Sequence, residues 1–522
     1  MLYRANKTNK VFLYIILSNI VLSMLLITIF NLSEKWMVWF SLGIIFLMLT
    51  PIVSSIFGSL ENFLFCSLVF SLQLQVGFNP VYRSMNKMAG LNGLNITLCF
   101  IIAFILLSTW FVKRCVQAAR PLTTDKTWNL AGAAFLLIST ISIVQTSDKH
   151  LTLFGLYEIL SLLLIAMMTC HYCSTRKGLH TARTVLLVSL LLQSLLIIFQ
   201  NVTGWEYSLA GKSIARVERF SGTMLVPSAA ATYIMVLLFF ALGTAFSAVS
   251  RRKKFLVWTI IFLGIVALLL TLTRSAWIGF FIGTLLILAY FCKIKTIKFS
   301  SVFYTVTLIL IGVVLTWSVL GSRINENHSD DAIVRWNLVL IAVDMIKKNP
   351  LLGVGLNNAT QVINKYAAET PLIANAEGFV WVFIVHNQFL LIASETGIPG
   401  LIAFLTVIGI ALRAAVMCMR ARDPVLSETG AVLTTSIIAL IWALNMDHVA
   451  GAQTYILLWF ILSFAIGLRN IMQADMALKG PAPYRRYTAH PYSEAHYGAT
   501  ASANTRLGDA YSDPAGRFGA AQ

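Results

Sequence analysis

The chain has 522 residues, of which 58% are hydrophobic and 11% are charged, and its formal net charge is +18. This apolar content exceeds what one water-soluble core needs, which excludes an ordinary soluble domain and indicates a polytopic membrane protein. Short basic loops beside membrane helices account for the positive charge, so no nucleic acid is expected as a partner.

Apolar runs of about 20 residues recur along the chain, and each is long enough as a helix to cross a hydrocarbon core of about 30 Å. The first run follows a short polar N-terminus without a small-residue cleavage site, so we interpret it as a retained helix. The expected spans are 11–31, 36–57, 61–77, 95–113, 128–147, 152–172, 183–203, 226–248, 255–273, 274–292, 302–320, 386–412, 429–447 and 452–469.

The pattern predicts an all-α bundle of 12–14 membrane helices. The lower number applies if a pair around 61–77 is lost, because Gln73 and Gln75 make that run the weakest. A single helix from Phe255 to Phe291 would be roughly 55 Å long, far more than a bilayer spans. The chain must therefore turn around near Arg274.

Basic loops set the expected orientation. With the N-terminus inside, 251–254, 293–298 and 413–422 all fall on one side, and short basic loops of this kind belong in the cytoplasm. Both termini are then cytoplasmic, and the longest external segment is 321–385. The tail at 474–522 lacks long aliphatic runs and is expected to be disordered.

Polar residues at the external membrane face are the candidates for function, because ionisable groups there are costly and tend to be functional. Arg216 and Arg219 precede the span that begins near Val226, where the free N–H groups and the positive dipole of a helix start suit an anion. The alternative is an interfacial basic anchor with Glu218 as its counter-charge.

Two further arginines each lie within a largely apolar stretch of the sequence. Arg274 lies in the tight external hairpin, and its guanidinium needs an anionic partner unless it snorkels to the interface. Arg335 lies early in a loop helix that Ser329 or Asp330 caps and that ends near Lys348. A cation is slightly disfavoured near the start of a helix. The alternative role of Arg335 is a pair with Asp331 at i−4.

His386 stands at the mouth of an apolar run on the external side. A neutral imidazole there can accept a proton from a hydroxyl, although a lone interfacial histidine is more often structural. Gly353 and Gly355 permit a sharp turn before it. His328 and the acidic residues beside it are too weak a signal for a metal site, so no metal is expected.

Three stretches together resemble a known family. TRSAWIGFF at 273–281, RWNLVLIAVDMIKKNPLLGVGLNN at 335–358 and HNQFLLIASETGIPGL at 386–401 occur in the order and spacing of the O-antigen ligase and polymerase superfamily of bacterial membrane glycosyltransferases. The resemblance covers about residues 200–470. The earlier spans fit by topology alone.

This resemblance implies a GT-C-like transmembrane domain over 1–470, with 321–385 as one large helical periplasmic loop. It also implies an inverting, metal-independent transfer, without a cofactor, of a glycan from undecaprenyl diphosphate at the periplasmic face of the inner membrane. By the match, Arg274 and Arg335 hold the diphosphate, and His386 assists the acceptor hydroxyl. Arg219 and Arg216 are further diphosphate candidates, and Trp336 and Asn387 are candidate supporting residues.

The acceptor distinguishes the members of this superfamily. A ligase joins the polymer to the lipid A core, and a polymerase joins it to a second lipid-linked glycan; the three stretches do not separate them, and ligase is favoured. Transfer to protein hydroxyls is a third reading. A non-enzymatic transporter of lipid-linked glycans would need several charges near the membrane midplane. Only Glu158 and Glu395 lie deep in the expected spans, which disfavours that class.

Overall fold

The computed structural model describes residues 59–83, 91–117, 121–204, 208–209, 212–213, 220–224, 226–247, 250–294, 307, 311, 329–369, 383, 385–446 and 452–479. The expected spans 11–31 and 36–57 lie outside these residues, as does 302–320 apart from residues 307 and 311.

Within the described part of the chain, ten helices are long and apolar enough to cross a membrane. They are α4 (Leu98–Gln117), α5 (Lys126–Ile141), α6 (Lys149–Cys173), α7 (Arg176–Thr203), α8 (Pro227–Ser247), α9 (Arg251–Leu270), α10 (Arg274–Lys293), α15 (Gln388–Cys418), α16 (Pro424–Met446) and α17 (Ala452–Lys479). The protein is therefore an all-α polytopic membrane protein, as the composition predicts.

Further elements accompany these helices. They are α3 (Leu60–Ser71), the 3-10 turn η1 (Ser142–Val144), α13 (Ser329–Lys348) and α14 (Ala359–Glu369), with the antiparallel strand pairs β1 (Gly77–Phe78) with β2 (Ile96–Thr97) and β3 (Ser208–Leu209) with β4 (Lys212–Ser213). The expected loop helix is α13. Its last turn carries Lys347 and Lys348, and Pro350 follows it.

The expected span 61–77 is wrong as a membrane crossing, because α3 has only 12 residues and ends at Ser71. The chain beyond it bonds to other elements instead of continuing the helix. The Gln73 carbonyl accepts from Thr223 Oγ1, and the Leu74 carbonyl accepts from Gln453 Nε2. Backbone groups freed from the helix therefore find partners inside the bundle, as an apolar environment requires.

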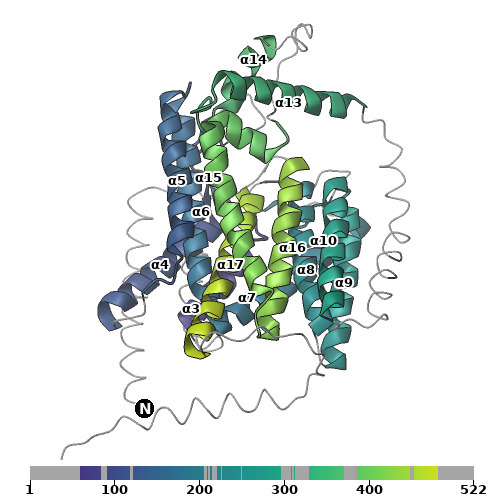
Figure 1. The fold of residues 1–522 in the computed structure, drawn as a ribbon. Coiled ribbons are helices and arrows are strands. Elements are labelled where there is room, and N and C mark those ends of the chain that lie inside the picture. Colours follow the sequence, from purple (N-terminus) through teal and green to yellow (C-terminus); the bar gives the residue numbers. More distant parts are fainter. Residues whose placement is uncertain are drawn as a thin grey trace, which may run out of the picture.

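The core of the bundle forms around α8 and α17. Within an 18-residue apolar stretch of α8, 94% of the residues are buried. This helix packs against α7, α9, α10, α16 and α17. Its apolar residues run all around the helix, as expected for a helix in the centre of a bundle. By contrast, only 22% of the residues in the 18-residue apolar stretch of α4 are buried, so α4 lies at the periphery of the bundle (Figure 1).

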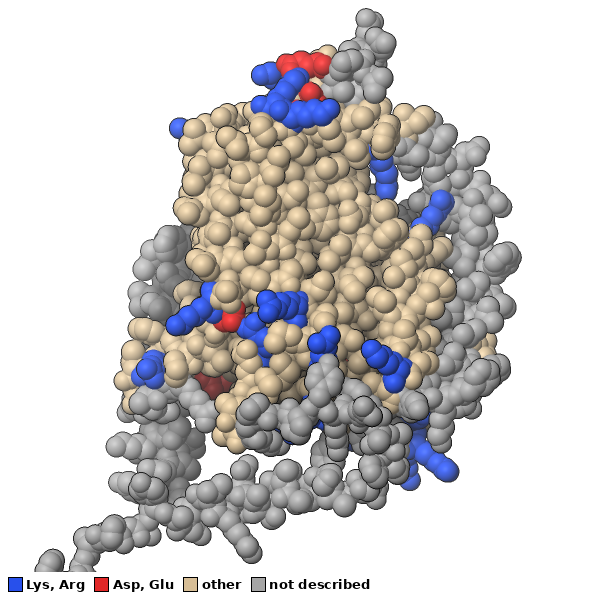
Figure 2. Space-filling model, viewed as in Figure 1, with Lys and Arg blue, Asp and Glu red and all other residues tan. Residues whose placement is uncertain are grey.

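The two ends of the bundle differ. We call the end where α9 passes into α10 the loop end, because α13 lies across the bundle there with α14 packed against it (Figure 1). The opposite end, where α9 begins at Arg251–Lys254, is the basic end. Figure 2 shows Lys and Arg side chains gathered toward the basic end, and a mixed group on α13 and α14, with a broad belt of uncharged residues between.

Candidate active site at the loop end

Arg274 is positioned by the turn between α9 and α10. The turn contains Leu272, whose φ of 54° reverses the chain, and Trp277 donates its indole N–H to the Leu268 carbonyl at 3.1 Å. Arg274 is the first residue of α10 and is exposed. The predicted reversal near Arg274 is therefore confirmed. The reversal presents the guanidinium beyond the apolar part of the helix.

His386 directly precedes the cap of α15. Asn387 is the N-cap, and its Oδ1 accepts from the backbone N–H groups of Phe389 and Leu390, each at 3.0 Å. The Asn387 Nδ2 then donates to Asn445 of α16, to its Oδ1 at 3.2 Å and to its carbonyl at 3.3 Å. His386 is partly buried and sits on a backbone that both helices hold.

The last turn of α16 connects Arg274 and His386. Trp442 donates its indole N–H to the carbonyl of Ser275, next to Arg274, at 2.9 Å. Asn445 lies three residues further along α16 and accepts from Asn387, next to His386. Residues three apart share a face of a helix, roughly one turn apart. The end of α16 therefore contacts both the residue that follows Arg274 and the residue that follows His386.

Arg335 approaches from α13. This helix buries a stripe at helical spacing, Leu338, Ile341, Ala342 and Met345, in a cluster that includes Val385 and Leu391. Val385 immediately precedes His386 and is only 4% exposed, so α13 packs directly on the segment that carries the histidine. Arg335 lies one turn before Leu338 and is exposed, as is Trp336 at 63%.

We call Arg274, Arg335, Trp336, His386 and Asn387 the loop-end cluster. The side chain of Asp331 lies outside what the structure describes. Arg216 and Arg219 lie outside the described residues as well.

Two glutamines of α7 anchor the segment 220–224 in the bundle. Gln200 exchanges hydrogen bonds with the backbone of Gly222, accepting its N–H at 3.0 Å. Gln193 donates to the Ser221 carbonyl at 3.0 Å and accepts from Thr223. Both glutamine side chains are buried. Sequence reasoning overlooked them, although an amide inside an apolar span needs a partner and is a usable signal.

A break in α15 joins it to the loop. Gly397 has non-helical backbone angles (φ 73°, ψ 179°), and Pro399 has no N–H to give to the Glu395 carbonyl. Residues after α13 use the freed groups: Val354 donates to Ser394 at 2.8 Å, Gly355 donates to Glu395 at 3.0 Å, and Ile398 donates to Pro350 at 2.8 Å. We call these three backbone bonds the clamp.

The clamp needs its glycines. Gly353 and Gly355 have φ of 65° and 98°, a conformation that favours glycine. A Cβ on Gly353 would lie 2.4 Å from the carbonyl carbon of Glu395, too close for any side chain. Nearby, Asn357 binds the backbone of Leu91 and Leu151 through its amide. The loop is therefore fixed to the bundle on two sides.

Glu395 has a structural partner. Its Oε1 accepts from the backbone N–H of Ala359, the first residue of α14, at 3.4 Å. A carboxylate at a helix N-terminus is favourable because the helix dipole is positive there. This carboxyl group therefore ties α14 to the break in α15.

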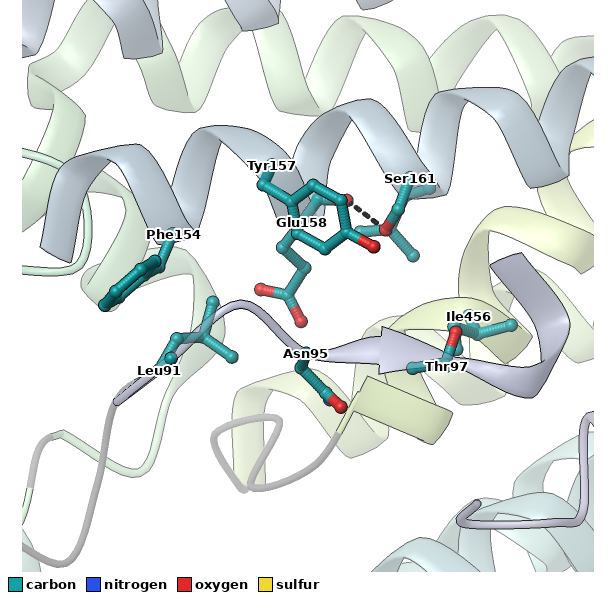
Figure 3. Close-up of a pocket in the computed structure, with 10 residues that line it drawn as sticks. Leu91, Asn95, Thr97, Phe154, Tyr157, Glu158, Ser161 and Ile456 are labelled. Atoms are coloured by element: carbon teal, nitrogen blue, oxygen red, sulfur yellow. Dashed lines mark hydrogen bonds between the residues drawn. The ribbon is translucent and has the colours of Figure 1, made fainter. Parts of the chain in front are cut away.

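Glu158 points into a separate pocket between α6, α17 and the extended segment that leads into β2 (Figure 3). Asn95, Thr97, Tyr157 and Ile456 help to line it, and Ser161 Oγ donates to the Glu158 carbonyl at 2.7 Å. None of its lining residues belongs to the loop-end cluster. The pocket and the cluster are two distinct features of the bundle.

Lys348 ties α13 to α14 outside the membrane helices. Its ammonium contacts Asp344 at 2.7 Å and Glu369 at 2.8 Å and lies 5.3 Å from the centre of the Tyr366 ring. The hydrogen bonds to Asp344 and Glu369 raise the pKa of Lys348 to about 12. The hydrogen bond from Lys348 in turn holds the pKa of Glu369 below its ordinary value. Both groups are therefore charged at neutral pH, which favours one orientation of the two helices.

Fold and site together define a polytopic helical membrane protein with cations and a histidine gathered at one end. Residues 259–405 match the family model described as O-antigen ligase. This match confirms the resemblance seen in the sequence and places this segment in the O-antigen ligase superfamily. The matched segment contains Arg274, Arg335, His386 and the break at Gly397. No curated protein matches the chain.

Proposed function

We propose that this protein is a membrane glycosyltransferase of the O-antigen ligase type that works at the loop end. The donor is a glycan on undecaprenyl diphosphate, and the acceptor is a hydroxyl of the lipid A core. The observation that carries this proposal is that Arg274, Arg335 and His386 all lie at the loop end. They come from three separate elements of the family-matched segment, and α13 and α16 hold them at one end of the bundle.

The arginines suit a diphosphate leaving group. A guanidinium is always charged and offers a planar fork of N–H donors that matches phosphate oxygens. Arg274 and Arg335 are both exposed at the loop end, where a lipid diphosphate would surface from the membrane. Fixed cations there stabilise the charge that develops on the leaving group, without a metal. Arg219 and Arg216 are the further candidates for the same role.

His386 suits the acceptor. In a single inverting displacement, the acceptor oxygen attacks the anomeric carbon and its proton passes to the imidazole. The bond from that carbon to the phosphate oxygen breaks, and undecaprenyl diphosphate leaves with the electron pair. A sugar hydroxyl is a poor nucleophile, and proton transfer to a positioned base contributes typically about 10²–10⁴-fold. Asn387 holds the backbone on which His386 sits, and Trp336 offers an exposed ring beside Arg335.

Charge distribution supports a periplasmic site in the inner membrane. The basic end includes Arg251–Lys254 and Lys293, and basic loops stay in the cytoplasm. The loop end then faces the periplasm, where lipid-linked glycans are joined.

A transfer assay tests this function. Purified protein is mixed with the lipid-linked glycan and with lipid A core from the producing bacterium, and the glycan-bearing product is measured. We expect His386→Ala to keep its fold and donor binding but to transfer glycan at least about a hundredfold more slowly. Near-normal transfer by that variant would remove His386 from the mechanism. A wild-type protein that moves the donor across vesicles but forms no glycosidic bond would be a transporter.

Deleting the gene separates the two acceptors. Loss of a ligase leaves long polymer on the carrier lipid and bare core on the outer-membrane lipid. Loss of a polymerase leaves one repeat unit on the core. An unchanged core lipid together with a lost secreted polysaccharide would contradict the ligase reading.

A further inference from the structure

The outer turn of α16 contributes two side chains that lie beyond the family-matched segment, which ends at 405. Trp442 is partly buried and donates to the Ser275 carbonyl at 2.9 Å. A Cβ on Gly279 would lie 3.1 Å from Trp442 Cδ1, so the glycine leaves room for the indole against α10. The tryptophan thus fits into the first turns of the helix that Arg274 begins.

Asn445 makes a matching contact with α15. The Oδ1 of Asn387 is already committed to the N–H groups of Phe389 and Leu390, which fixes the orientation of its amide. Its Nδ2 is then directed at Asn445, whose own Nδ2 donates back to Ile441 at 3.0 Å. The whole amide chain is therefore in one defined arrangement. Loss of Asn445 Oδ1 would leave the Asn387 amide with only its 3.3 Å bond to the Asn445 backbone carbonyl, which would loosen the cap beneath His386.

We propose that Trp442 and Asn445 are positioning residues, one for each half of the reaction. Trp442 fixes the turn that presents Arg274 to the donor diphosphate, and Asn445 fixes the cap that presents His386 to the acceptor hydroxyl. This inference rests on the proposed function. It adds that the geometry between donor and acceptor is set by α16, a helix that touches neither substrate in this scheme.

Two conservative variants separate the two roles. Trp442→Phe keeps an aromatic ring, although a smaller one, and removes the N–H donor. Asn445→Leu keeps the size and removes the acceptor oxygen. A typical hydrogen bond contributes about 0.5–1.5 kcal/mol, or roughly twofold to thirteenfold. We expect Trp442→Phe to raise the donor KM about threefold to tenfold with kcat nearly unchanged. Asn445→Leu should lower kcat by about the same factor with the donor KM unchanged.

Rescue and a matched control complete the experiment. Asn445→Asp keeps an oxygen that accepts from Asn387, so it should restore most of kcat. Asn470→Leu removes a comparable bond, from Asn470 Nδ2 to Ser174 Oγ at 3.1 Å, at the basic end and should change neither parameter. Equal changes of kcat and KM in both loop-end variants, or effects no larger than those of Asn470→Leu, would overturn the proposal.

The two proposals can fail separately. If the wild-type protein forms no product with either acceptor, the proposed function fails. Binding of undecaprenyl diphosphate, followed by the shift in melting temperature, then still tests the donor half. Trp442→Phe should weaken that binding about threefold to tenfold while Asn445→Leu does not. Equal binding by the two variants would contradict the role of Trp442.

Discussion

Arg274 and Arg335 expose guanidinium groups at one end of the bundle, and their planar geometry should matter as much as their charge. We therefore expect Arg274→Ala and Arg335→Ala each to lose most activity, roughly tenfold to a hundredfold, because hydrogen bonds to charged groups contribute about 1.5–3 kcal/mol. Lysine at either position should rescue poorly. Initial rates of transfer at saturating and limiting donor measure both effects.

A basic-end arginine provides the control. Arg252 is exposed at the start of α9, so Arg252→Ala should leave transfer unchanged. Normal turnover by Arg335→Lys at saturating donor would show that Arg335 acts only through its positive charge and not through the geometry of its guanidinium group.

The arginines and the histidine could be predicted from the sequence because each is a polar residue at the end of an apolar run. An ionisable side chain at such a position is costly and therefore tends to be functional. Trp442 and Asn445 could not be predicted in this way. A tryptophan and an asparagine near a helix end are ordinary there, and only the packing of α16 against α10 and α15 gives them a role.

The break in α15 is the element on which the loop depends. Gly397 has a backbone conformation that is essentially open to glycine alone, and a Cβ there would lie 2.4 Å from the Leu351 carbonyl oxygen. We expect Gly397→Ala to break the clamp, with strain of about 1–3 kcal/mol. The variant should melt at a lower temperature in detergent. It should also lose transfer activity per folded molecule, because α13 loses its fixed position over His386.

Gly409 offers a matched control within the same helix. A Cβ there meets nothing within 4 Å, so Gly409→Ala should leave both the melting temperature and the transfer activity unchanged or slightly raise the former. Equal behaviour of the two alanine variants would show that the break is not needed.

Helices were predictable from the sequence because apolar runs of membrane length have few alternatives. The observed helix ends differ from the expected ones by several residues where polar residues continue the helix. For example, α7 begins at Arg176, after the cap Thr175, whereas the expected span begins at 183. The clamp was not predictable, since it pairs backbone groups of Val354 and Ser394 that local pattern cannot relate.

Across the whole molecule, polar contacts join the helices at both ends. At the basic end, Arg176 bridges Asp423 of the α15–α16 connection and Asp475 of α17, and Arg183 pairs with buried Glu428. At the loop end, the helices that carry Arg274 and His386 are joined by hydrogen bonds from neutral side chains. Ion pairs therefore join helices at the basic end, and hydrogen bonds from neutral side chains join α16 to the helices that carry Arg274 and His386.

Orientation in the membrane is the last prediction. If basic loops stay inside, a cysteine at Lys253 or Ala474 should react with an impermeant thiol reagent only after the cells are opened. A cysteine at Leu351 should react in intact cells. Leu351 is 70% exposed, whereas Asn358 in the same loop is fully buried and would make a poor probe. Cys115 and Cys292 are exposed and must first be replaced. Labelling of Lys253→Cys from outside would show that the bundle has the opposite orientation and that the loop-end cluster faces the cytoplasm.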